Sequence, residues 1–391
     1  MSPRSFSTLR LVRILKRQSH KSILGADMIE TGVVREPAGA EKRPDLIGIQ
    51  MLRGLAASMV VLHHTLEESL ASKAAPTSPD WLTTFGASGV DIFFVISGFV
   101  MVYASFASER PSIGAGTFLA KRFVRIYPFY WTCLLLILIL WGLGFYRKLD
   151  PTPGIWLRAV LLLPTDQPVL TVSWTLVYEM YFYMLFAAAL FLQWSRHVAV
   201  FGITTAIAAL LAASLLLGDR EDFLSNPIVI EFCMGMLLAT AFRRLHVMPA
   251  WIGIAAGLSA IVLASLFVPH ETTNGLPPAA RVVAWGLPAL LIVASSLSLK
   301  AVGSRLERAM AWLGDCSYAI YLTHPFVMVV FARIVKNQPR LSEMSLLPVV
   351  PFVVLICLAA GAAAHVLIER RLLDFGRRLL APRRSEAALP R

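Results

Sequence analysis

The residues best suited to chemistry near the start of the chain are Arg53 and His64, eleven positions apart in one apolar stretch. Eleven helical steps bring His64 to within about 20° of the face that carries Arg53, and about 16 Å along the axis. His63 is turned about 100° away, and Glu67 or Glu68 is close enough to orient the ring of His64. If Arg53 lies at a membrane boundary, His64 lies near the middle of a core about 30 Å thick, where ionisable groups are functional candidates. A buried histidine with satisfied hydrogen bonds is the structural alternative.

Two further ionisable groups, Glu179 and His324, fall inside later apolar stretches. Counted from the ends of these stretches, His64, Glu179 and His324 lie at depths that allow them to meet in the outer half of a helical bundle. An acid and two histidines suit proton transfer or nucleophilic catalysis. They equally suit a proton path through a transporter.

Arg122 and Arg125 are three positions apart and share a helical face, at the same boundary where the helix of Arg53 begins. Three guanidinium groups at one depth can hold phosphates through charge-assisted hydrogen bonds. Anchoring of a helix by basic residues on the cytoplasmic side explains the same pair.

Small and aromatic residues flank these positions. Gly89, Ser97 and Gly98 predict close approach between helices, and Asp91 is expected to cap a helix or to pair at the interface. An aromatic belt at the membrane–water interface explains a further group of side chains. They are Tyr127, Tyr130 and Trp131.

The composition indicates a polytopic membrane protein, with 57% hydrophobic and 15% charged residues and a mean hydropathy of +0.67. The formal charge of +12 does not predict nucleic-acid binding, because basic residues in membrane proteins gather in cytoplasmic loops. All four cysteines lie in apolar segments, and no metal site is predicted.

We predict an all-α, polytopic membrane bundle of about ten transmembrane helices. The expected spans are 47–66, 84–106, 122–144, 172–193, 198–217, 226–242, 250–268, 281–299, 311–332 and 346–368. A shorter apolar piece, 155–164, is bracketed by prolines and is expected to lie at the membrane surface.

Most of the 36 Lys and Arg residues fall on the side that holds both termini, which the positive-inside rule assigns to the cytoplasm. Three parts are expected: a basic cytoplasmic N-terminal tail over 1–46, a transmembrane domain over 47–369, and a basic cytoplasmic C-terminal tail over 370–391. No soluble domain is predicted.

Five short motifs follow one another across residues 47–369. They are Leu52-Arg-Gly-Leu-Ala-Ala followed by His64, Gly89-Val-Asp-Ile-Phe-Phe-Val-Ile-Ser-Gly-Phe99, Arg122-Phe-Val-Arg-Ile-Tyr-Pro128, Ser173-Trp-Thr-Leu-Val-Tyr-Glu-Met-Tyr-Phe-Tyr183 and Leu313-Gly-Asp-Cys-Ser-Tyr-Ala-Ile-Tyr-Leu-Thr-His-Pro325. In this order they resemble the acyltransferase 3 family of integral membrane acyltransferases, and within it the bacterial exopolysaccharide-production acetyltransferases.

The resemblance implies transfer of an acyl group, commonly acetyl, from cytoplasmic acyl-CoA to a sugar hydroxyl of an exopolysaccharide or another envelope glycan. No cofactor is expected to be bound permanently, since acetyl-CoA is the donor substrate. The other expected partners are a glycan or lipid-linked sugar and the lipid bilayer of the bacterial cytoplasmic (inner) membrane. The matching positions are His64, Glu179 and His324 for catalysis and Arg53, Arg122 and Arg125 for the donor.

Two other classes of function remain open. A proton-coupled transporter or flippase for a glycan or lipid-linked sugar fits the spans and the buried ionisable residues. The chain has no evident pair of repeated halves with matching broken helices, and the arginines suit a phosphorylated donor better than a proton. A non-catalytic partner in polysaccharide assembly is the third alternative. The oligomeric state is not predicted.

Overall fold

The computed structural model describes residues 46–71, 80–145, 152–216, 223, 226–242, 244, 249–267, 278–338 and 346–381. Within these ranges the regular secondary structure is helical throughout, which confirms the predicted all-α class for this part of the chain. The predicted tails lie outside it, except for residue 46 and for residues 370–381.

The helices follow one another with short connections. In chain order they are α2 (Ile47–Ala71), α3 (Asp80–Ala87), α4 (Gly89–Ser105), α5 (Ala115–Gly142), α6 (Pro153–Leu161), α7 (Trp174–Phe191), α8 (Arg196–Leu216), α9 (Ile230–Ala241), α10 (Ala250–Leu266), α11 (Pro278–Arg281), α12 (Leu287–Ser296), α13 (Arg305–Asp315), α14 (Ser317–Asn337), α16 (Leu346–Ala364) and α17 (Arg370–Leu380). Two π-helical segments continue α11 and α16, at Val282–Gly286 and His365–Glu369.

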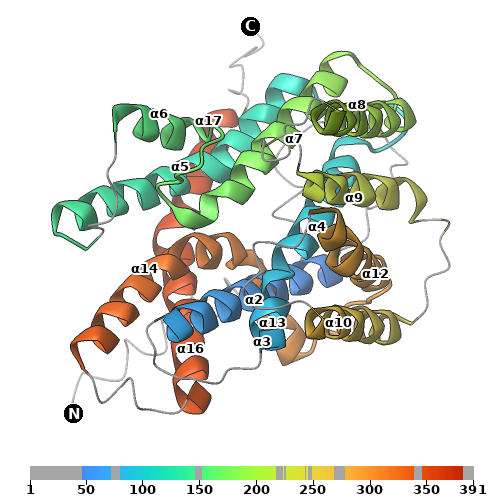
Figure 1. The fold of residues 1–391 in the computed structure, drawn as a ribbon. Coiled ribbons are helices and arrows are strands. Elements are labelled where there is room, and N and C mark those ends of the chain that lie inside the picture. Colours follow the sequence, from blue (N-terminus) through green and yellow to red (C-terminus); the bar gives the residue numbers. More distant parts are fainter. Residues whose placement is uncertain are drawn as a thin grey trace, which may run out of the picture.

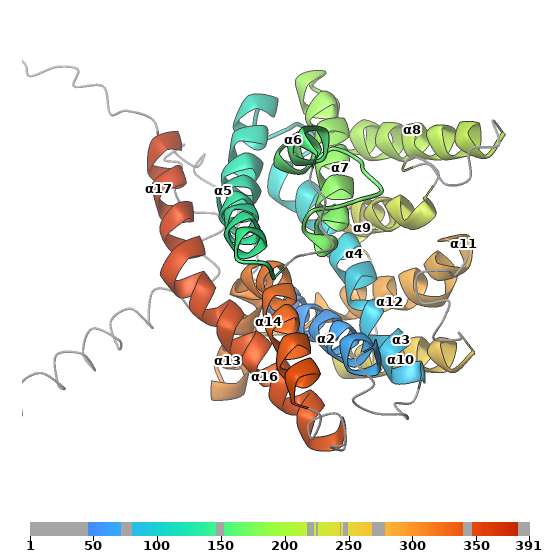
Figure 2. The same cartoon turned by 60° about the vertical axis from the view of Figure 1, so that its left-hand side comes forward.

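Helix α2 lies near the middle of the assembly (Figure 1 and Figure 2) and packs against α3, α4, α12, α13, α14 and α16. Ala56, Ala57 and Val61 in α2 are completely buried. A helix that is apolar on most of its faces is expected to be enclosed by other helices. The two ionisable residues first identified, Arg53 and His64, are therefore carried by a rigid central element.

The described residues of the predicted apolar spans are mostly helical, but 84–106 is divided between α3 and α4, and 311–332 between α13 and α14. The short piece expected at the surface corresponds to α6. Six helical segments in the described ranges are long and apolar enough to cross a membrane: Trp81–Ser105, Ala115–Gly142, Thr171–Phe191, Arg196–Ser214, Ser317–Asn337 and Val349–Leu380. Three apolar helices are shorter: Pro227–Ala241, Ala250–Leu266 and Val282–Ser296. The structure supports a multi-pass membrane protein, and the count of ten crossings and their orientation stay predictions.

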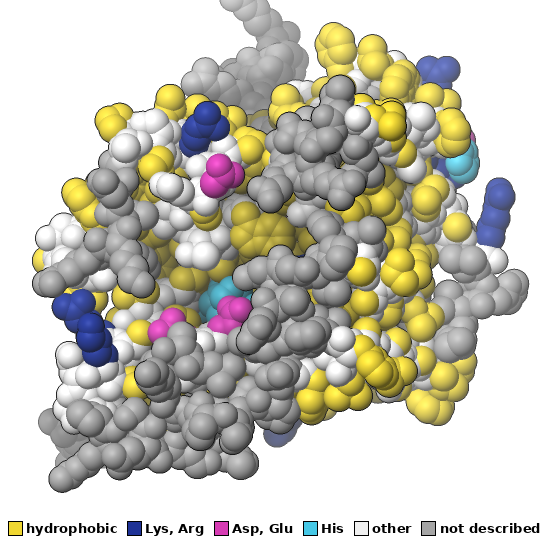
Figure 3. All heavy atoms as spheres, in the orientation of Figure 1, with side chains coloured by type: hydrophobic (Ala, Val, Ile, Leu, Met, Phe, Trp, Pro, Cys, Tyr) yellow, Lys and Arg dark blue, Asp and Glu magenta, His cyan; other side chains and the backbone are white. Residues whose placement is uncertain are grey.

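The surface agrees with a membrane location. Large apolar side chains are exposed on the outer helices, including Phe191 (77%), Phe201 (74%) and Phe267 (81%). Figure 3 shows hydrophobic side chains covering much of the face formed by α8, α9 and α10. Contiguous apolar surface of this kind is uncommon on monomers in water and matches contact with lipid.

Helices α4 and α9 approach each other closely through glycines. A Cβ atom at Gly98 would lie 2.0 Å from the carbonyl oxygen of Phe232, and one at Gly235 would lie 2.0 Å from that of Val95. The close approach predicted for Gly98 is confirmed, and Gly235 is its unpredicted counterpart. Both positions exclude any side chain, because the atoms met are backbone atoms.

Replacing Gly98 by alanine is expected to destabilise the protein by about 3 kcal/mol, since α4 and α9 must separate to admit the methyl group. Unfolding of the detergent-purified protein, followed by intrinsic fluorescence on heating, measures this. Gly116→Ala in α5 is the matched control, because a Cβ atom there meets nothing within 4 Å. Equal melting temperatures for the two variants would contradict the close packing of α4 on α9.

Three aromatic side chains of α5 hold the end of α6. The hydroxyl of Tyr127 donates to the carbonyl of Leu161, that of Tyr130 to Ala159, and the indole nitrogen of Trp131 to Val160. The last carbonyls of a helix have no partner within the helix. These residues, for which the sequence indicates only an interfacial belt, therefore fix α6 against α5.

A buried charge cluster lies between α4, α9 and α11. Asp91 is completely buried and accepts two hydrogen bonds from Arg281, at 3.1 and 2.8 Å. Glu231 is also completely buried, and its carboxylate oxygens have no hydrogen-bond partner among the described residues. Asp91 thus pairs, as one of the two expectations had it, but in the buried interior and not at the interface, and its partner is 190 residues away in sequence.

Candidate active site

The structure brings His64 of α2 and His324 of α14 together, with their ring centroids 5.0 Å apart. Nδ1 of His64 lies 3.0 Å from the carbonyl oxygen of Val60, and Nδ1 of His324 lies 3.2 Å from that of Ile320. A carbonyl oxygen only accepts hydrogen bonds, so each neutral ring carries its proton on Nδ1 and a lone pair on Nε2. Nε2 of His64 is thus able to take a proton from a hydroxyl group.

His324 is completely buried, and its Nε2 atom has no hydrogen-bond partner within the described part of the chain. Buried polar atoms are rarely left without a partner unless they have a function or bind a group that is not present. The contact between the two predicted catalytic histidines agrees with the depths inferred from the sequence.

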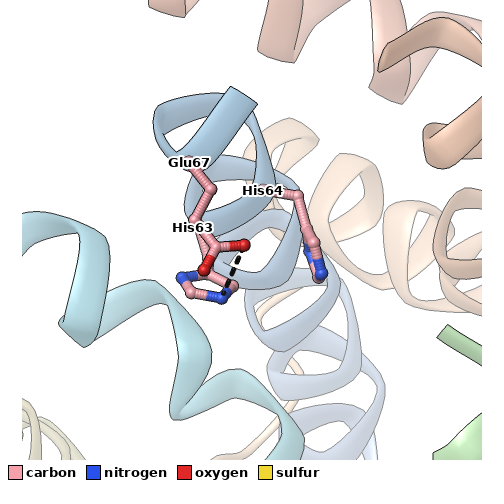
Figure 4. A group of neighbouring side chains, drawn as sticks. All are labelled: His63, His64 and Glu67. Carbon is pink, nitrogen blue, oxygen red and sulfur yellow. Dashed lines mark ion pairs between the residues drawn. The ribbon is translucent and has the colours of Figure 1, made fainter. Parts of the chain in front are cut away.

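Glu67 forms its ion pair with His63 and not with His64. One carboxylate oxygen of Glu67 lies 3.4 Å from Nε2 of His63, and Figure 4 shows these two side chains directed toward each other. Nδ1 of His63 is 2.8 Å from the carbonyl oxygen of Thr83. The orienting contact of His64 is therefore the Val60 carbonyl, which corrects the expectation for Glu67.

The three predicted donor arginines and Glu179 line one cavity of about 170 Å³. Most other lining side chains are apolar. They are Ile49, Val90, Phe93, Phe94, Ile96, Val100, Met101, Ile126 and Leu176. Arg53, Arg122 and Arg125, which were predicted to lie at one membrane boundary, thus line one cavity. Helices α2 and α5 form it together with α4, α7 and α14.

Arg122 and Arg125 differ in their surroundings. The guanidinium of Arg122 stacks on the rings of Phe118 and Tyr183, at 5.3 and 5.4 Å, and forms no ion pair with an acid in the described ranges. Arg125 instead donates to Glu369 at 2.7 Å, and the completely buried Glu369 also lies 2.7 Å from Nδ1 of His365. The charge of Arg122 is available to a ligand, whereas that of Arg125 is already neutralised.

Arg53 is held indirectly from α13. Its Nη1 atom donates to Gln50 Oε1 at 3.2 Å, and the amide of Gln50 donates to Asp315. This contact depends on Gly314, where a Cβ atom would lie 1.8 Å from the carbonyl oxygen of Gln50.

Glu179 lies on the arginine side of the site. Ser97 donates to its carboxylate at 3.2 Å, and the hydroxyl of Tyr183 donates to the same oxygen. The depths inferred from the sequence allow Glu179 to meet the histidines in the outer half of the bundle. In the structure Glu179 lines the same cavity as Arg53 and Arg122, and its partner Tyr183 is also the ring on which Arg122 stacks.

Tyr321 connects the cavity to the histidines. It lines the cavity, its ring centroid is 6.0 Å from that of His324, and its hydroxyl bonds to Thr175 at 2.8 Å and to the Val172 carbonyl at 2.8 Å. His64 and His324 themselves do not line the cavity. Tyr321 therefore stands at the boundary between the two groups of predicted site residues.

Several residues of the site were not singled out from the sequence. Tyr183, Asp315 and Tyr321 lie inside the quoted motifs, so their motif membership was the signal, and Ser97 was noted only as a small residue. Glu369 marked only the end of the predicted transmembrane domain. Its pairing with Arg125 spans 244 residues, and no local pattern indicates it.

Comparison with known proteins identifies the family of the chain. The family model of the acyltransferase domain (Acyl_transf_3) matches residues 46–366. The exopolysaccharide production protein ExoZ of Rhizobium meliloti (strain 1021) is 33% identical over 312 residues, covering 75% of this chain and 92% of the relative. No solved structure matches the chain.

Two further relatives match over most of their length. The acyltransferase MdmB of Streptomyces mycarofaciens is 24% identical over 396 residues, covering 90% of this chain and 96% of the relative. The putative membrane-bound transacylase BcsY of Komagataeibacter xylinus is 28% identical over 369 residues, covering 89% of this chain and 88% of the relative. The chain belongs to the acyltransferase 3 family and is a multi-pass membrane acyltransferase.

Proposed function

We propose that the protein is an O-acyltransferase of the bacterial cytoplasmic membrane that moves an acetyl group from cytoplasmic acetyl-CoA to a sugar hydroxyl of an exopolysaccharide or another envelope glycan. The observation that carries the proposal is the cavity lined by Arg53 and Arg122, neither of which forms an ion pair within the described ranges, next to two histidines with acceptor nitrogens. The relative named for exopolysaccharide production supports the class of acceptor. Both termini face the cytoplasm in this proposal.

The donor binds through its phosphates at the arginine end of the cavity. Arg122 and Arg53 supply the charge, because no acid forms an ion pair with either in the described ranges. The apolar walls accept the pantetheine arm, which carries the thioester past Tyr321 toward His64. Glu179 acts from the same end of the cavity, through Ser97 and Tyr183.

His64 provides the chemical step. Its Nε2 atom takes the proton of the acceptor hydroxyl, whose oxygen attacks the thioester carbonyl carbon. The carbon–sulfur bond breaks, the new ester forms, and the proton passes from His64 to the sulfur of the departing CoA. Alternatively, the acyl group first attaches to Nε2 of His64 and is then transferred to the hydroxyl. His324 supports the ring of His64 in both routes.

The transporter alternative is not favoured. The family model and the relatives that match the chain are named for acyl transfer or for exopolysaccharide production. A cavity with positive charge suits a phosphorylated donor better than a proton path.

Incubation of the purified protein in nanodiscs with radiolabelled acetyl-CoA, with and without cell glycan, tests the proposal. Label is expected to appear in glycan, with release of stoichiometric CoA. Label on the protein without glycan would favour the covalent route. Absence of CoA binding and of turnover, with every acyl-CoA and glycan supplied, would overturn the proposed function.

Replacing Arg122 by glutamine is expected to raise KM for acetyl-CoA about 10- to 100-fold, since a charge-assisted hydrogen bond contributes about 1.5–3 kcal/mol. The KM for the glycan is expected to change little. Steady-state kinetics with each substrate varied in turn measures both effects. Arg333→Gln is the matched control, because Arg333 stacks on Phe145 at 5.1 Å but does not line the cavity. Equal effects of the two variants would mean that Arg122 only anchors its helix.

A further inference from the structure

Three potential metal ligands gather in the second half of α2. One ligand atom from each of His63, His64 and Glu67 lies within 4.8 Å of the others. Figure 4 shows His63 and Glu67 directed toward each other, with His64 beside them on the same part of the helix. Imidazole and carboxylate groups are common ligands of Zn²⁺.

The contact between His63 and Glu67 requires a positive charge. Nδ1 of His63 lies 2.8 Å from the Thr83 carbonyl oxygen and therefore carries a hydrogen. The lone pair of Nε2 in the neutral ring then faces a Glu67 oxygen at 3.4 Å, and both atoms are acceptors. Such a pair is stable only with a proton or a cation between the two atoms.

One ligand separation matches that of a tetrahedral zinc site, and the ligand atom of His64 lies within 4.8 Å of the other two. Two ligand atoms that are each about 2.0–2.1 Å from a tetrahedral Zn²⁺ ion lie about 3.4 Å apart. Nε2 of His63 and the Glu67 carboxylate oxygen already have this separation. The hydrogen bonds of the Nδ1 atoms of His63 and His64 to backbone carbonyls are the outer contacts that orient histidine ligands in metal sites.

We infer that His63, His64 and Glu67 form a Zn²⁺ site whose occupation blocks acyl transfer. Two histidines and one glutamate leave the fourth position of a tetrahedral ion open to water. Coordination uses the Nε2 lone pair of His64, which is the proton acceptor in the proposed reaction. The binding of zinc does not depend on the proposed function, whereas its inhibitory effect rests on it.

The site is accessible from outside the bundle. The Glu67 side chain is 32% exposed, whereas that of His63 is 8% exposed. On the face shown in Figure 3, histidine and acidic side chains lie together in a hollow over the region of α2. An ion is therefore able to meet the carboxylate first and the two imidazoles behind it.

The binding test uses purified full-length protein that a chelator has freed of metal. Titration calorimetry with Zn²⁺ and elemental analysis after dialysis are expected to give one ion per chain. The visible absorption of bound Co²⁺ is expected to have the intensity of tetrahedral coordination. His63→Gln and Glu67→Gln are expected to weaken binding about 100-fold. His197→Gln is the matched control, because His197 forms an exposed pair with Glu109 at 3.6 Å.

The outcomes of the binding test separate clearly. Loss of binding in His63→Gln and Glu67→Gln, with binding kept in His197→Gln, supports the site. No bound ion in the wild type, or equal affinity in all four proteins, overturns it. Elution as a single species on size-exclusion chromatography shows whether each variant is folded, and Glu67→Gln decides the result if His63→Gln fails to fold.

The inhibition test measures acetyl transfer with and without saturating Zn²⁺. The wild type is expected to lose at least about 90% of its activity, because bound zinc occupies the Nε2 lone pair of His64 that accepts the proton. His63→Gln is expected to keep its basal activity and to resist zinc. Equal inhibition of the two proteins, or none in the wild type, overturns the blocking role. Failure of all proteins to transfer acetyl without metal refutes the proposed function and leaves the binding result to decide the site.

Discussion

Replacing His64 by glutamine is expected to lower kcat for acetyl transfer about 100- to 10,000-fold, the range lost when a general base is removed. Nδ1 of His64 is held by the Val60 carbonyl at 3.0 Å, which leaves Nε2 as the proton acceptor. A glutamine side chain fills similar space but cannot take the proton. The KM for acetyl-CoA is expected to change little, because the proposed binding site of the donor phosphates is the arginine end of the cavity.

His63→Gln is the matched control for this prediction. The two histidines are adjacent, and their ring centroids are 4.8 Å apart. His63 is bonded to Thr83 and Glu67, and it does not contact His324 through any of the ring contacts described. Initial rates with radiolabelled acetyl-CoA in metal-free buffer are expected to fall in His64→Gln and to persist in His63→Gln. The reverse result would transfer the catalytic role to His63.

Replacing Arg125 by glutamine is expected to destabilise the protein by about 3 kcal/mol, which is the cost of leaving one member of a buried ion pair without its partner. Glu369 is completely buried, and its contacts are Arg125 at 2.7 Å and His365 at 2.7 Å. Without Arg125, the buried carboxylate of Glu369 has lost the guanidinium group with which it forms its ion pair. Thermal unfolding in detergent, followed by fluorescence, measures the loss.

The double variant Arg125→Gln/Glu369→Gln separates this structural effect from a role in binding. Removing both charges is expected to recover most of the stability, to within about 1 kcal/mol of the wild type, because no buried charge then remains unpaired. The stacking of Arg125 on Tyr318, at 5.3 Å, accounts for the remainder. If the double variant is as unstable as Arg125→Gln, the ion pair does not hold η7, the π-helical segment His365–Glu369, against α5.

These two arginines show why a shared helical face does not imply a shared role. Arg122 and Arg125 are indistinguishable in the sequence, since both lie in one motif at the start of one helix. Within the described residues only Arg125 of the two forms an ion pair with an acid, and that partner comes from the far end of the chain. Arg122→Gln is therefore expected to affect the donor KM more than stability, and Arg125→Gln the reverse.

The sequence by itself determined the helical class and the positions of the apolar helices. It also contains the motifs, with His64, Arg122 and His324, by which the chain resembles one family. These features depend on composition and on local periodicity, which a single stretch of chain contains completely. The close approach at Gly98 was also visible, because small residues in an apolar helix permit it.

Only the tertiary structure decided which groups meet. It joined Glu369 to Arg125 and Asp315 to Gln50, across 244 and 265 residues. It showed that Glu179 lines the cavity of the three arginines and that Glu67 forms an ion pair with His63. Helical periodicity states which face a residue occupies but not which helix covers that face. That choice depends on the shapes of both packing surfaces, such as the backbone contacts at Gly98, Gly235 and Gly314.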